Sequence, residues 1–283
     1  MKILIFGVTG NCGKYVSSYF ISKGAEVWGV GRRKDLKSIP SVKYISGSIE
    51  DKSLFKKLPC DFDLVINFAG VQPSILKTSE NTSYYETLQS YVDVNIVGTF
   101  NVIEWVSKNK IGTYIYSSTH RDFELYWQEK RALGNNEPVA INYKGDHSMY
   151  AISKVVGQMM GDYIIGNSEV RCFNLRLPMM FLVPDHPTYL LNGAPAIMPF
   201  LKLIKDATES KTLEIWGDPN LPRDYVYIDN LVSLINGCHE SNISGGTFSV
   251  GTGEGVTTEN FVKEIGSVFG NGSSIDLKYV PEK

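Results

Sequence analysis

The sequence contains few of the residues from which small proteins build disulfide or metal cross-links. It has four cysteines and four histidines in 283 residues, spread along the chain without a C-x-x-C pair. This spacing provides no ligand pattern for zinc and no disulfide framework. A chain of this length buries enough apolar surface to fold without such links. We therefore expect reduced cysteines and no metal site.

Long apolar runs and an excess of one charge are also missing. No stretch approaches the ~18 consecutive apolar residues of a membrane-spanning helix. The apolar start of the chain ends at Gly7, which is too short for a signal sequence. The 28 basic and 30 acidic residues leave a net charge of −2, so no general attraction to nucleic acid or acidic membranes follows. The sequence predicts a soluble cytoplasmic protein without a nucleic-acid or membrane partner.

The sequence does contain short apolar runs that alternate with helical apolar spacing. We expect strands at residues 2–6, 26–30, 42–45, 63–68, 113–116 and 170–175, and helices at 13–22, 91–108 and 150–164. Strands that alternate with helices are typical of a parallel sheet covered on both faces. The predicted fold class is therefore α/β, with a Rossmann-type doubly wound parallel sheet.

The pattern changes after residue 178. Five prolines fall between Pro178 and Pro199, and prolines at this density favour loops and short elements. Regular patterns then return, with helices expected at 200–206, 231–239 and, capped by Thr257, through Phe269, and strands at 213–216 and 247–250. We predict a dinucleotide-binding domain at residues 1–178. Residues 179–283 would form mainly a small substrate-binding cap, from which some elements return to the main sheet.

Three glycines lie between the first predicted strand and the first predicted helix. Gly7, Gly10 and Gly13 have G-x-x-G-x-x-G spacing, which differs from the better-known G-x-G-x-x-G. Glycines here permit a tight turn and a close approach of the backbone to a pyrophosphate, which the following helix N-terminus attracts. The segment predicts a dinucleotide-binding loop, and a glycine-rich turn without a ligand is the alternative.

The end of the second strand bears on the choice of cofactor. NAD sites usually place an acidic residue there to bind the ribose hydroxyls, but this strand is followed by Gly31, Arg32 and Arg33. Two guanidinium groups suit a 2′-phosphate. The sequence therefore favours NADP over NAD, with the alternative that both arginines only stack on the adenine or face solvent.

Tyr150 and Lys154 begin a predicted helix with a spacing of four, which places them on one face. The phenol becomes a base near neutral pH only if its pKa falls by about three units, or roughly 4 kcal/mol, and a nearby ammonium acts in that direction. Such a tyrosine would exchange a carbinol proton while hydride moves to or from a nicotinamide. Ser117, Ser118 and Thr119 end the fifth strand, at the edge where ligands bind in such sheets. The alternative is a surface pair on an amphipathic helix.

Together these features resemble one family, the extended short-chain dehydrogenase/reductases, also known as the NAD-dependent epimerase/dehydratase family. The resemblance covers nearly the whole chain, through motifs at 7–13, 64–70, 95–101, 115–119, 150–154, 174–178 and 223–229. It implies that Thr119, Tyr150 and Lys154 are the catalytic residues. It also implies a nucleotide-diphosphate sugar as substrate and a homodimer formed through the helices at 91–108 and 150–164.

The resemblance further implies which residues contact the two ligands. The predicted cofactor contacts are Gly7, Thr9, Gly10, Asn11, Cys12, Gly13, Arg32, Arg33, Ser48, Ile49, Phe68, Ala69, Gly70, Asn95, Tyr150, Lys154 and Leu177. Ser118, Asn174 and Arg223 would contact the substrate. Arg223 matches the arginine that the family uses on a diphosphate, and a flexible cation in a loop suits that role. An internal ion pair with Asp224 or Asp229 is the alternative.

Departures from the family pattern narrow the reaction. The family's 4,6-dehydratases have an acid soon after the threonine, whereas Thr119 is followed by His120 and Arg121, and Glu124 becomes available only through an insertion. The Cys and His of the 3,5-epimerase-reductases have no match. We expect an NAD(P)-dependent 4-epimerase that transfers hydride transiently at C4 of the sugar. The alternatives are an NADPH-dependent 4-keto-sugar reductase, a 4,6-dehydratase and a non-catalytic NADP-binding protein, against which the presence of Tyr150 and Lys154 argues.

Overall fold

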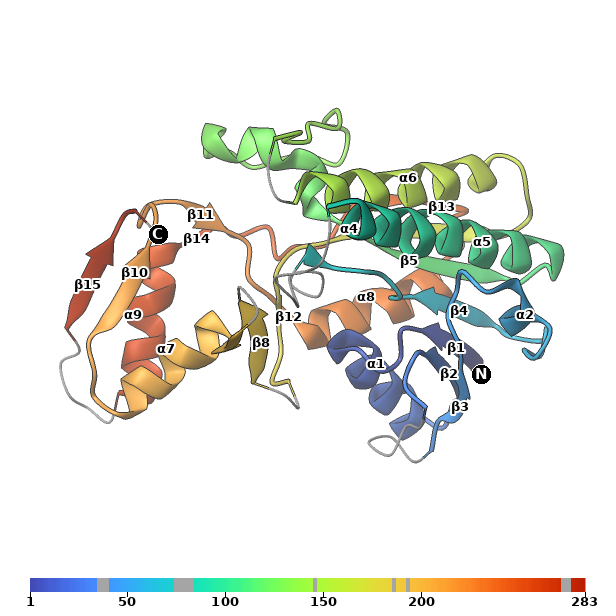
Figure 1. The fold of residues 1–283 in the computed structure, drawn as a ribbon, viewed down its shortest axis with the longest axis horizontal. Coiled ribbons are helices and arrows are strands. Elements are labelled where there is room, and N and C mark those ends of the chain that lie inside the picture. The colour runs from blue at the N-terminus through green and yellow to red at the C-terminus, as the bar shows by residue number, and fades with distance from the viewer. Residues whose placement is uncertain are drawn as a thin grey trace.

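The computed structural model describes residues 1–34, 41–73, 84–144, 147–184, 187–191, 194–270 and 276–282. Its main body is a sheet between two layers of helices, and a smaller lobe extends from one side (Figure 1). Among the described helices, none has both the length and the apolar character needed to cross a membrane.

The central sheet has seven strands among the described residues, and all of them run parallel. In spatial order they are β13 (Gly245–Ser249), β6 (Arg171–Leu177), β5 (Thr113–Thr119), β4 (Leu64–Asn67), β1 (Lys2–Phe6), β2 (Glu26–Gly31) and β3 (Lys43–Ser46). The chain winds outward on both sides of β1 and β4, so the carboxyl ends of these two strands mark the point where such sheets bind ligands. This arrangement confirms the predicted Rossmann-type doubly wound sheet.

Both faces of the sheet are buried, which explains the continuous apolar runs of its strands. The covering helices are α1 (Asn11–Ser22) and α8 (Ile228–Glu240) on one face, and α2 (Lys52–Phe55), α5 (Thr99–Lys108) and α6 (Ser148–Ile165) on the other. Figure 1 shows α1 and α8 below the sheet and α5 and α6 above it. Ile3 and Ile5 of β1 belong to the first core, and Leu4 and Phe6 to the second. Alternate residues of one strand therefore serve opposite cores.

Residues 84–108 form one continuous helix of mixed type. It consists of α4 (Tyr84–Ser90), a π-helix η1 (Tyr91–Gly98) and α5, whereas the sequence pattern predicts a regular helix over 91–108. Gly98 lies so close to Ile49 that a β-carbon would stand 2.5 Å from Ile49 Cγ1. A π-helix has wider turns than an α-helix and often occurs at functional sites. Here the π-helical segment holds Asn95 in the interior.

The smaller lobe has a core of its own. Its helices and longer strands are α7 (Pro199–Thr208), β10 (Leu213–Trp216), α9 (Thr258–Phe269) and β15 (Leu277–Val280). The lobe also has two shorter strand pairs, β8 (Thr188–Leu191) with β9 (Ala194–Ile197) and β11 (Pro222–Arg223) with β14 (Val256–Thr257). A third pair, β7 (Met180–Phe181) with β12 (Val226–Tyr227), joins the lobe to the main body. Leu213, Ile215 and Ile265 lie at the centre of the lobe. Thr257 caps α9 by accepting the Asn260 N–H at 3.2 Å, as the sequence predicts.

The last third of the chain contributes to both parts. Helix α8 packs with α1 against the main sheet, and β13 adds to its edge beside β6, while α9 and β15 belong to the lobe. Arg171 of β6 fastens this return, because its guanidinium donates to the carbonyls of His239 and Ser241 at the end of α8. Residue 178 is thus where the chain first leaves the main sheet.

Between β5 and α6 the chain forms an additional segment, residues 120–144, termed the insertion. It begins with a 3₁₀ helix, η2 (His120–Glu129), for which no sequence pattern predicted an element. Lys130 at its end forms an ion pair with Asp218 of the lobe at 2.5 Å. The insertion therefore connects the carboxyl end of β5 with the lobe.

Candidate active site

The loop between β1 and α1 has the geometry of a phosphate-binding turn. Gly7 has φ of +79°, a conformation that favours glycine, and its carbonyl accepts the Gly10 N–H at 3.0 Å. A β-carbon on Gly13 would stand 2.4 Å from Gly7 O, so α1 begins directly on the loop. In this described stretch no side chain caps α1 and no acidic residue lies in its first turn. Its N–H groups are therefore available to an anion.

Thr9, Asn11 and Cys12 complete this loop. Asn11 and Cys12 are the first two residues of α1, and Thr9 lies against the end of β2, where a β-carbon on Gly31 would stand 2.9 Å from Thr9 Cγ2. Burial raises the pKa of the Cys12 thiol to about 11, so the thiol stays protonated at neutral pH. Cys12 is therefore a packing neighbour of the site and has no nucleophilic character.

Arg32 and Arg33 follow β2 and are exposed. The Tyr44 hydroxyl donates to Arg33 O at 2.7 Å, which fixes the backbone at this point. Neither guanidinium forms an ion pair with another residue in the described ranges. Because β2 ends beside Thr9 of the glycine loop, both arginines directly follow the strand that borders this loop.

Ser48 and Ile49 lie after β3, beside the helix at 84–108. The Ser48 hydroxyl donates to the Glu50 carboxylate, and the Ile49 carbonyl accepts the Asn101 side-chain amide at 3.0 Å. The Ile49 side chain is buried.

The loop after β4 contains Phe68, Ala69 and Gly70, and it packs on the glycine loop. A β-carbon on Gly7 would stand 2.7 Å from Ala69 N, and the Ala69 N–H donates to Asn67 Oδ1 at 3.0 Å. The two loops thus form one surface at the carboxyl ends of β1 and β4, as expected for the centre of a dinucleotide site.

Asn95 joins the loop after β4 to helix α6. Its side chain accepts the Val71 N–H at 2.7 Å and donates to Val71 O at 3.1 Å and to Ser153 Oγ at 2.9 Å. With 1% of its surface exposed, its amide has no open side toward a cofactor. Asn95 thus positions the loop at Gly70 and the helix that carries Lys154, and its direct contact with a cofactor stays a prediction.

The three predicted catalytic residues come together at the carboxyl end of β5. Thr119 is the last residue of β5, next to Leu177 at the end of β6, and Tyr150 lies in the first turn of α6. The Thr119 side chain lies close enough to Tyr150 to act on its phenol. Burial raises the pKa of Tyr150, while the nearby Thr119 hydroxyl and the charge of Arg121 act in the opposite direction.

Lys154 lies one helical turn after Tyr150 and is buried. Its Nζ donates to Ser117 Oγ at 3.3 Å and stands 4.3 Å from the centroid of the Tyr116 ring. Within the described ranges no carboxylate forms an ion pair with it, and burial lowers the pKa of Lys154 to about 7. A β-carbon on Gly70 would stand 3.8 Å from this Nζ, so Lys154 also borders the predicted cofactor loop.

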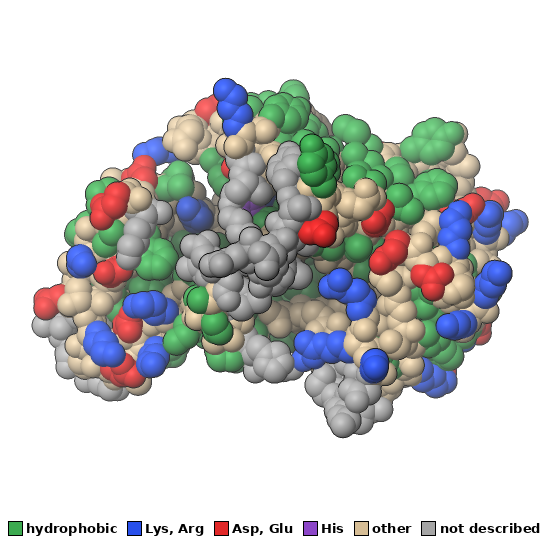
Figure 2. Space-filling model, viewed as in Figure 1, with side chains coloured by type: hydrophobic (Ala, Val, Ile, Leu, Met, Phe, Trp, Pro, Cys, Tyr) green, Lys and Arg blue, Asp and Glu red, His purple; other side chains and the backbone are tan. Residues whose placement is uncertain are grey.

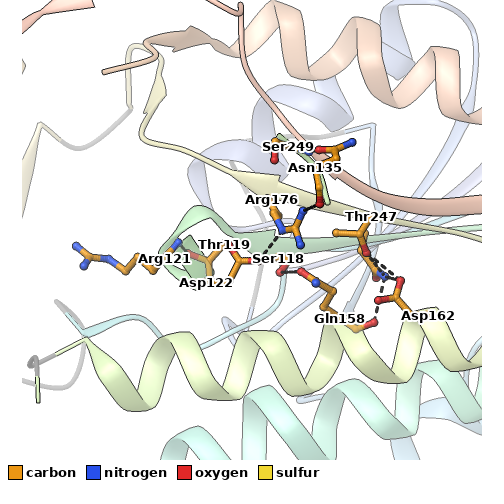
Figure 3. Close-up of polar contacts among 11 residues, drawn as sticks. Ser118, Thr119, Arg121, Asp122, Asn135, Gln158, Asp162, Arg176, Thr247 and Ser249 are labelled. Atoms are coloured by element: carbon orange, nitrogen blue, oxygen red, sulfur yellow. Dashed lines mark hydrogen bonds and ion pairs between the residues drawn. The ribbon is translucent and has the colours of Figure 1, made fainter. Parts of the chain in front are cut away.

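Ser118 and Asn174 are buried between the sheet and α6. The Ser118 hydroxyl donates to Gln158 Oε1 at 2.8 Å, and the Asn174 amide donates to Gln158 O at 3.1 Å and to Asp162 Oδ1 at 2.8 Å. Figure 3 shows the contact between Ser118 and Gln158. Asn174 is wholly buried in the middle of β6, away from its carboxyl end. Both side chains thus attach α6 to the sheet, and their contact with a substrate stays a prediction.

Arg223 lies on β11 and is exposed. Asp224 accepts the Thr252 N–H at 2.9 Å, and Asp229 accepts the Tyr15 hydroxyl. In the part of the chain that the structure describes, neither carboxylate forms an ion pair with Arg223. The interpretation of Arg223 as a partner of these two acids therefore has no support here.

His120 shows that Arg223 approaches the Thr119 end of β5. The pKa of His120 is lowered to about 4 by burial and by the nearby charges of Arg121 and Arg223. Arg121 also forms an ion pair with Glu124 at 2.9 Å. Two arginines and a neutral imidazole thus gather next to Thr119, which is an arrangement suited to an anionic ligand.

Sequence reasoning missed several residues that hold the site in place. Ser153 accepts from Asn95, Gln158 accepts from Ser118, and the Tyr116 ring lies beside Lys154. A signal was present for Gln158, because it follows Lys154 by four residues, as Lys154 follows Tyr150. The inward face of α6 thus combines these polar side chains with the buried Ala151 and Val155 along its first half.

Comparison with known proteins agrees with this geometry. Residues 3–251 match the NAD-dependent epimerase/dehydratase family. The chain belongs to this family. Protein CapI of Staphylococcus aureus is 25% identical over 250 residues, which cover 83% of this chain and 68% of CapI. The family match identifies the chain as an enzyme of the nucleotide-sugar epimerase/dehydratase class.

Solved structures of other proteins have the same fold. The UDP-N-acetylglucosamine 4-epimerase from Methanobrevibacter ruminantium M1, in complex with UDP-N-acetylmuramic acid, superposes with a TM-score of 0.78 at 20% identity, covering 100% of this chain and 86% of that one. WbmF of Bordetella bronchiseptica, in complex with NAD+, has a TM-score of 0.73 at 16% identity and covers 99% and 84%. These similarities extend the family's fold over both the sheet and the lobe.

Proposed function

We propose that this family member is an NAD(P)-dependent nucleotide-sugar epimerase that transfers hydride transiently at C4 of an NDP-hexose. The observation that carries the proposal is the meeting of Thr119 and Tyr150 at the carboxyl end of β5, where Thr119 acts on the Tyr150 phenol, with Lys154 buried one helical turn away. The similarity in fold to a 4-epimerase supports it.

The three side chains divide the proton chemistry among them. A bound nicotinamide supplies the acceptance and return of hydride. Tyr150 takes the proton of the C4 hydroxyl and later returns it, and Thr119 holds that oxygen within reach. In this proposal Lys154, one helical turn after Tyr150, would favour the phenolate of Tyr150 when its ammonium is charged. Because the pKa of Lys154 is lowered to about 7, this assistance is sensitive to pH near neutrality.

The residues of the glycine loop fit a dinucleotide. The close contacts of Gly7 and Gly13 bring the backbone of the loop and the uncapped start of α1 to one point, where Thr9, Gly10, Asn11 and Cys12 would surround a pyrophosphate. Phe68, Ala69, Gly70 and Leu177 would border the rest of the cofactor, with Ser48 and the backbone of Ile49 beside its adenine. The exposed Arg32 and Arg33 support NADP as the preferred form, and NAD is the alternative.

The nucleotide diphosphate of the substrate would lie between the sheet and the lobe. Arg223 on β11 and His120 at the end of β5 come from these two parts, and the charge of Arg223 acts on His120. A guanidinium that pairs with no acid among the described residues suits a diphosphate. The sugar would then point toward Thr119 and Tyr150.

A 4-keto-sugar reductase is the second candidate, and Arg32 and Arg33 are the observation that favours it. A reductase draws on exchangeable NADPH, whose 2′-phosphate these arginines would recognise. A 4,6-dehydratase is less well supported, because Glu124, the candidate for its acid, is engaged in an ion pair with Arg121.

We further propose a homodimer formed through the outer faces of α5 and α6. Val97 and Phe100 on one side and Met159 and Tyr163 on the other are large apolar or aromatic side chains that remain exposed. Figure 2 shows apolar side chains gathered over this region, at the upper right. Apolar patches of this kind mark surfaces for protein partners.

The assignment of Tyr150 is tested by Tyr150→Phe, with Tyr163→Phe as the matched control on the exposed side of the same helix. Wild type and both variants are incubated with UDP-, GDP-, CDP- and dTDP-hexoses, and the sugar product is analysed together with absorbance at 340 nm. We expect kcat to fall about 10²- to 10⁴-fold in Tyr150→Phe and to be unchanged in Tyr163→Phe. Full turnover by Tyr150→Phe would overturn the assignment.

The same incubation separates the two candidate reactions. An epimerase gives an isomerised sugar without net change at 340 nm, because hydride returns to the sugar from which it came. A reductase consumes one NADPH for each product formed. Stoichiometric loss of NADPH with a 4-keto sugar would therefore replace the epimerase proposal.

A further inference from the structure

Asp122 and Arg176 form an ion pair that none of the functional assignments uses. The Asp122 carboxylate accepts from Arg176 Nε, and the exposed fractions of the two side chains are 0% and 5%. Asp122 belongs to η2 of the insertion and Arg176 to β6. Figure 3 shows the pair next to Thr119. A buried charge pair at this place calls for a reason, because its desolvation offsets most of its attraction.

The pair lies directly beside the end of β5. Arg176 is in register with Ser118, and Leu177 with Thr119. On the other side, η2 begins immediately after Thr119, and Asp122 is its third residue. The ion pair thus joins β6 to the first turn of η2 across the residue that carries the predicted catalytic hydroxyl.

The first turn of η2 sets the direction of the Thr119 hydrogen bonds. Thr119 Oγ1 accepts the Arg121 N–H at 3.2 Å, and the same side chain lies close enough to Tyr150 to act on its phenol. A hydroxyl that accepts from the backbone has its own proton left to donate in another direction. The direction in which Thr119 can donate therefore depends on where the Arg121 N–H points, which is a property of η2.

Contacts around the pair tie η2 to the sheet. Arg176 Nη1 donates to Asn135 O at 3.1 Å, and its guanidinium lies 4.4 Å from the centroid of the Phe123 ring. Asn135 Oδ1 accepts the Ser249 N–H of β13 at 2.8 Å. The second carboxylate oxygen of Asp122 has no hydrogen-bond partner among the described residues. The orientation of this carboxylate thus rests on Arg176, while the backbone of Asp122 is held by the Ala140 N–H, which donates to Asp122 O at 2.6 Å.

We propose that the Asp122–Arg176 pair is a positioning device that aims the Thr119 hydroxyl at Tyr150. Apolar contacts would stabilise the insertion as well as an ion pair does, but they would not fix the direction of a hydrogen bond. The proposal rests on the proposed function, in which Thr119 and Tyr150 are catalytic. It makes Asp122 and Arg176 positioning residues that touch neither substrate nor cofactor.

The test compares Asp122→Asn with Glu137→Gln. Both changes turn a carboxylate that pairs with an arginine of this region into an amide, but the Arg131–Glu137 pair lies in a more exposed part of the insertion. We expect kcat to fall about 10- to 100-fold in Asp122→Asn, as for a misplaced catalytic group, with KM changed less than about twofold. Glu137→Gln would keep both values. Arg176→Lys, which retains the charge without the planar fork, serves as a second variant if Asp122→Asn does not fold.

A double-mutant cycle distinguishes positioning from general damage. In a Thr119→Val background no hydroxyl remains to be aimed, so Asp122→Asn would cause no further loss of kcat. An equal loss in both backgrounds would overturn the proposal.

A second readout needs no substrate. The ionisation of Tyr150 is followed by ultraviolet difference titration against Tyr150→Phe, and Asp122→Asn would shift it to higher pH, as Thr119→Val does. An unchanged titration in Asp122→Asn, together with a shift in Thr119→Val, would overturn the proposal. If the wild type turns over no nucleotide sugar, the proposed function fails, and this titration still decides whether Asp122 acts on Tyr150.

Discussion

Lys154 combines two requirements that oppose each other. Its place beside Tyr150 suits a positive charge, yet it is buried, and among the described residues no carboxylate pairs with it. Burial disfavours the ammonium, which is why its pKa falls to about 7. In the unfolded chain the ammonium is in water and has no desolvation penalty. The folded protein is therefore destabilised, relative to the unfolded chain, at every pH where the unfolded lysine is charged. This side chain therefore links stability to pH.

Replacing Lys154 by methionine tests this link. In the wild type the unfolded state binds one more proton than the folded state between pH 7 and the ordinary lysine pKa of 10.5. The free energy of unfolding of wild type therefore rises across this window by about 1.4 kcal/mol per pH unit relative to Lys154→Met. We expect the variant to be the more stable protein below pH 7 and to lose this advantage toward pH 10.5, as measured by urea unfolding.

An exposed lysine provides the control for this experiment. Lys108 on α5 pairs with Glu104 at the surface, so Lys108→Met would show no comparable dependence over the same range. A stability difference between Lys154→Met and wild type that stays constant from pH 7 to 10.5 would contradict the lowered pKa of Lys154.

Arg32 is the residue on which the cofactor preference depends. If its guanidinium binds the 2′-phosphate, Arg32→Ala lowers the affinity for NADP about 10- to 100-fold, the size of one or two charge-assisted hydrogen bonds, and leaves NAD within about twofold. Isothermal titration with both cofactors measures this, with the exposed Lys57→Ala as a control for net charge. Equal loss of both affinities would show that Arg32 does not distinguish the two.

Single residues also show where sequence reasoning ends. Glycine spacing, the Tyr150–Lys154 pair and the strand-end hydroxyls were visible in the sequence because each follows a local rule. Asn95 and Asn174 match family motifs equally well, but their role depends on which way the side chain points. Both lie in the interior with their amides engaged. The direction in which a side chain points from a π-helix, or from the middle of a strand, cannot be read from the local sequence.

Secondary-structure elements were predicted best where burial is uniform. The observed β1 matches its predicted range, and the other strands of the main sheet shift by a few residues, because a strand buried on both faces is a continuous apolar run. In the lobe, β10 also matches its predicted range. Among the elements that were not predicted, two escaped for opposite reasons. The π-helix η1 has an apolar sequence that an α-helix would also suit, and η2 is a 3₁₀ helix that depends on its buried contact with β6.

The π-helical segment predicts the outcome of Asn95→Ala. This change removes three hydrogen bonds of a buried amide and leaves the Val71 backbone unpaired. We expect the free energy of unfolding to fall by about 3 kcal/mol and the affinity for either nicotinamide cofactor to fall as well, because the loop at Gly70 is released. Urea unfolding and cofactor titration measure the two effects.

Asn109→Ala is the matched control for this variant. Asn109 ends α5, and its amide donates to Trp105 O at 2.8 Å near the surface, so its loss would cost no more than about 1 kcal/mol and would not change cofactor affinity. If Asn95→Ala behaves like Asn109→Ala, the link between η1, the loop after β4 and α6 is weaker than its hydrogen bonds indicate.

At the scale of the whole molecule, the exposed apolar faces of α5 and α6 bear on assembly. Phe100 lies on this surface with 47% of its area exposed. In the proposed dimer, Phe100→Glu would place a carboxylate in an apolar contact and shift the protein to monomers, as measured by light scattering after gel filtration. Val268→Glu on the lobe, at a side chain that is also exposed, would leave the oligomeric state unchanged. A wild-type protein that is monomeric at high micromolar concentration would refute the dimer.

The path of the chain has a consequence for the order in which the protein is made. Strand β6 pairs with β13, in which Gly245 lies opposite Cys172 and Ser249 opposite Arg176. This pairing forms only after residues 245–249 have been made. During synthesis the lobe segment that follows β6 must therefore emerge before the sheet gains its last strand. Until then β6 presents an open edge, with its unpaired N–H and C=O groups available to other chains. The nascent enzyme is thus most exposed to aggregation after most of its nucleotide-binding sheet has already formed.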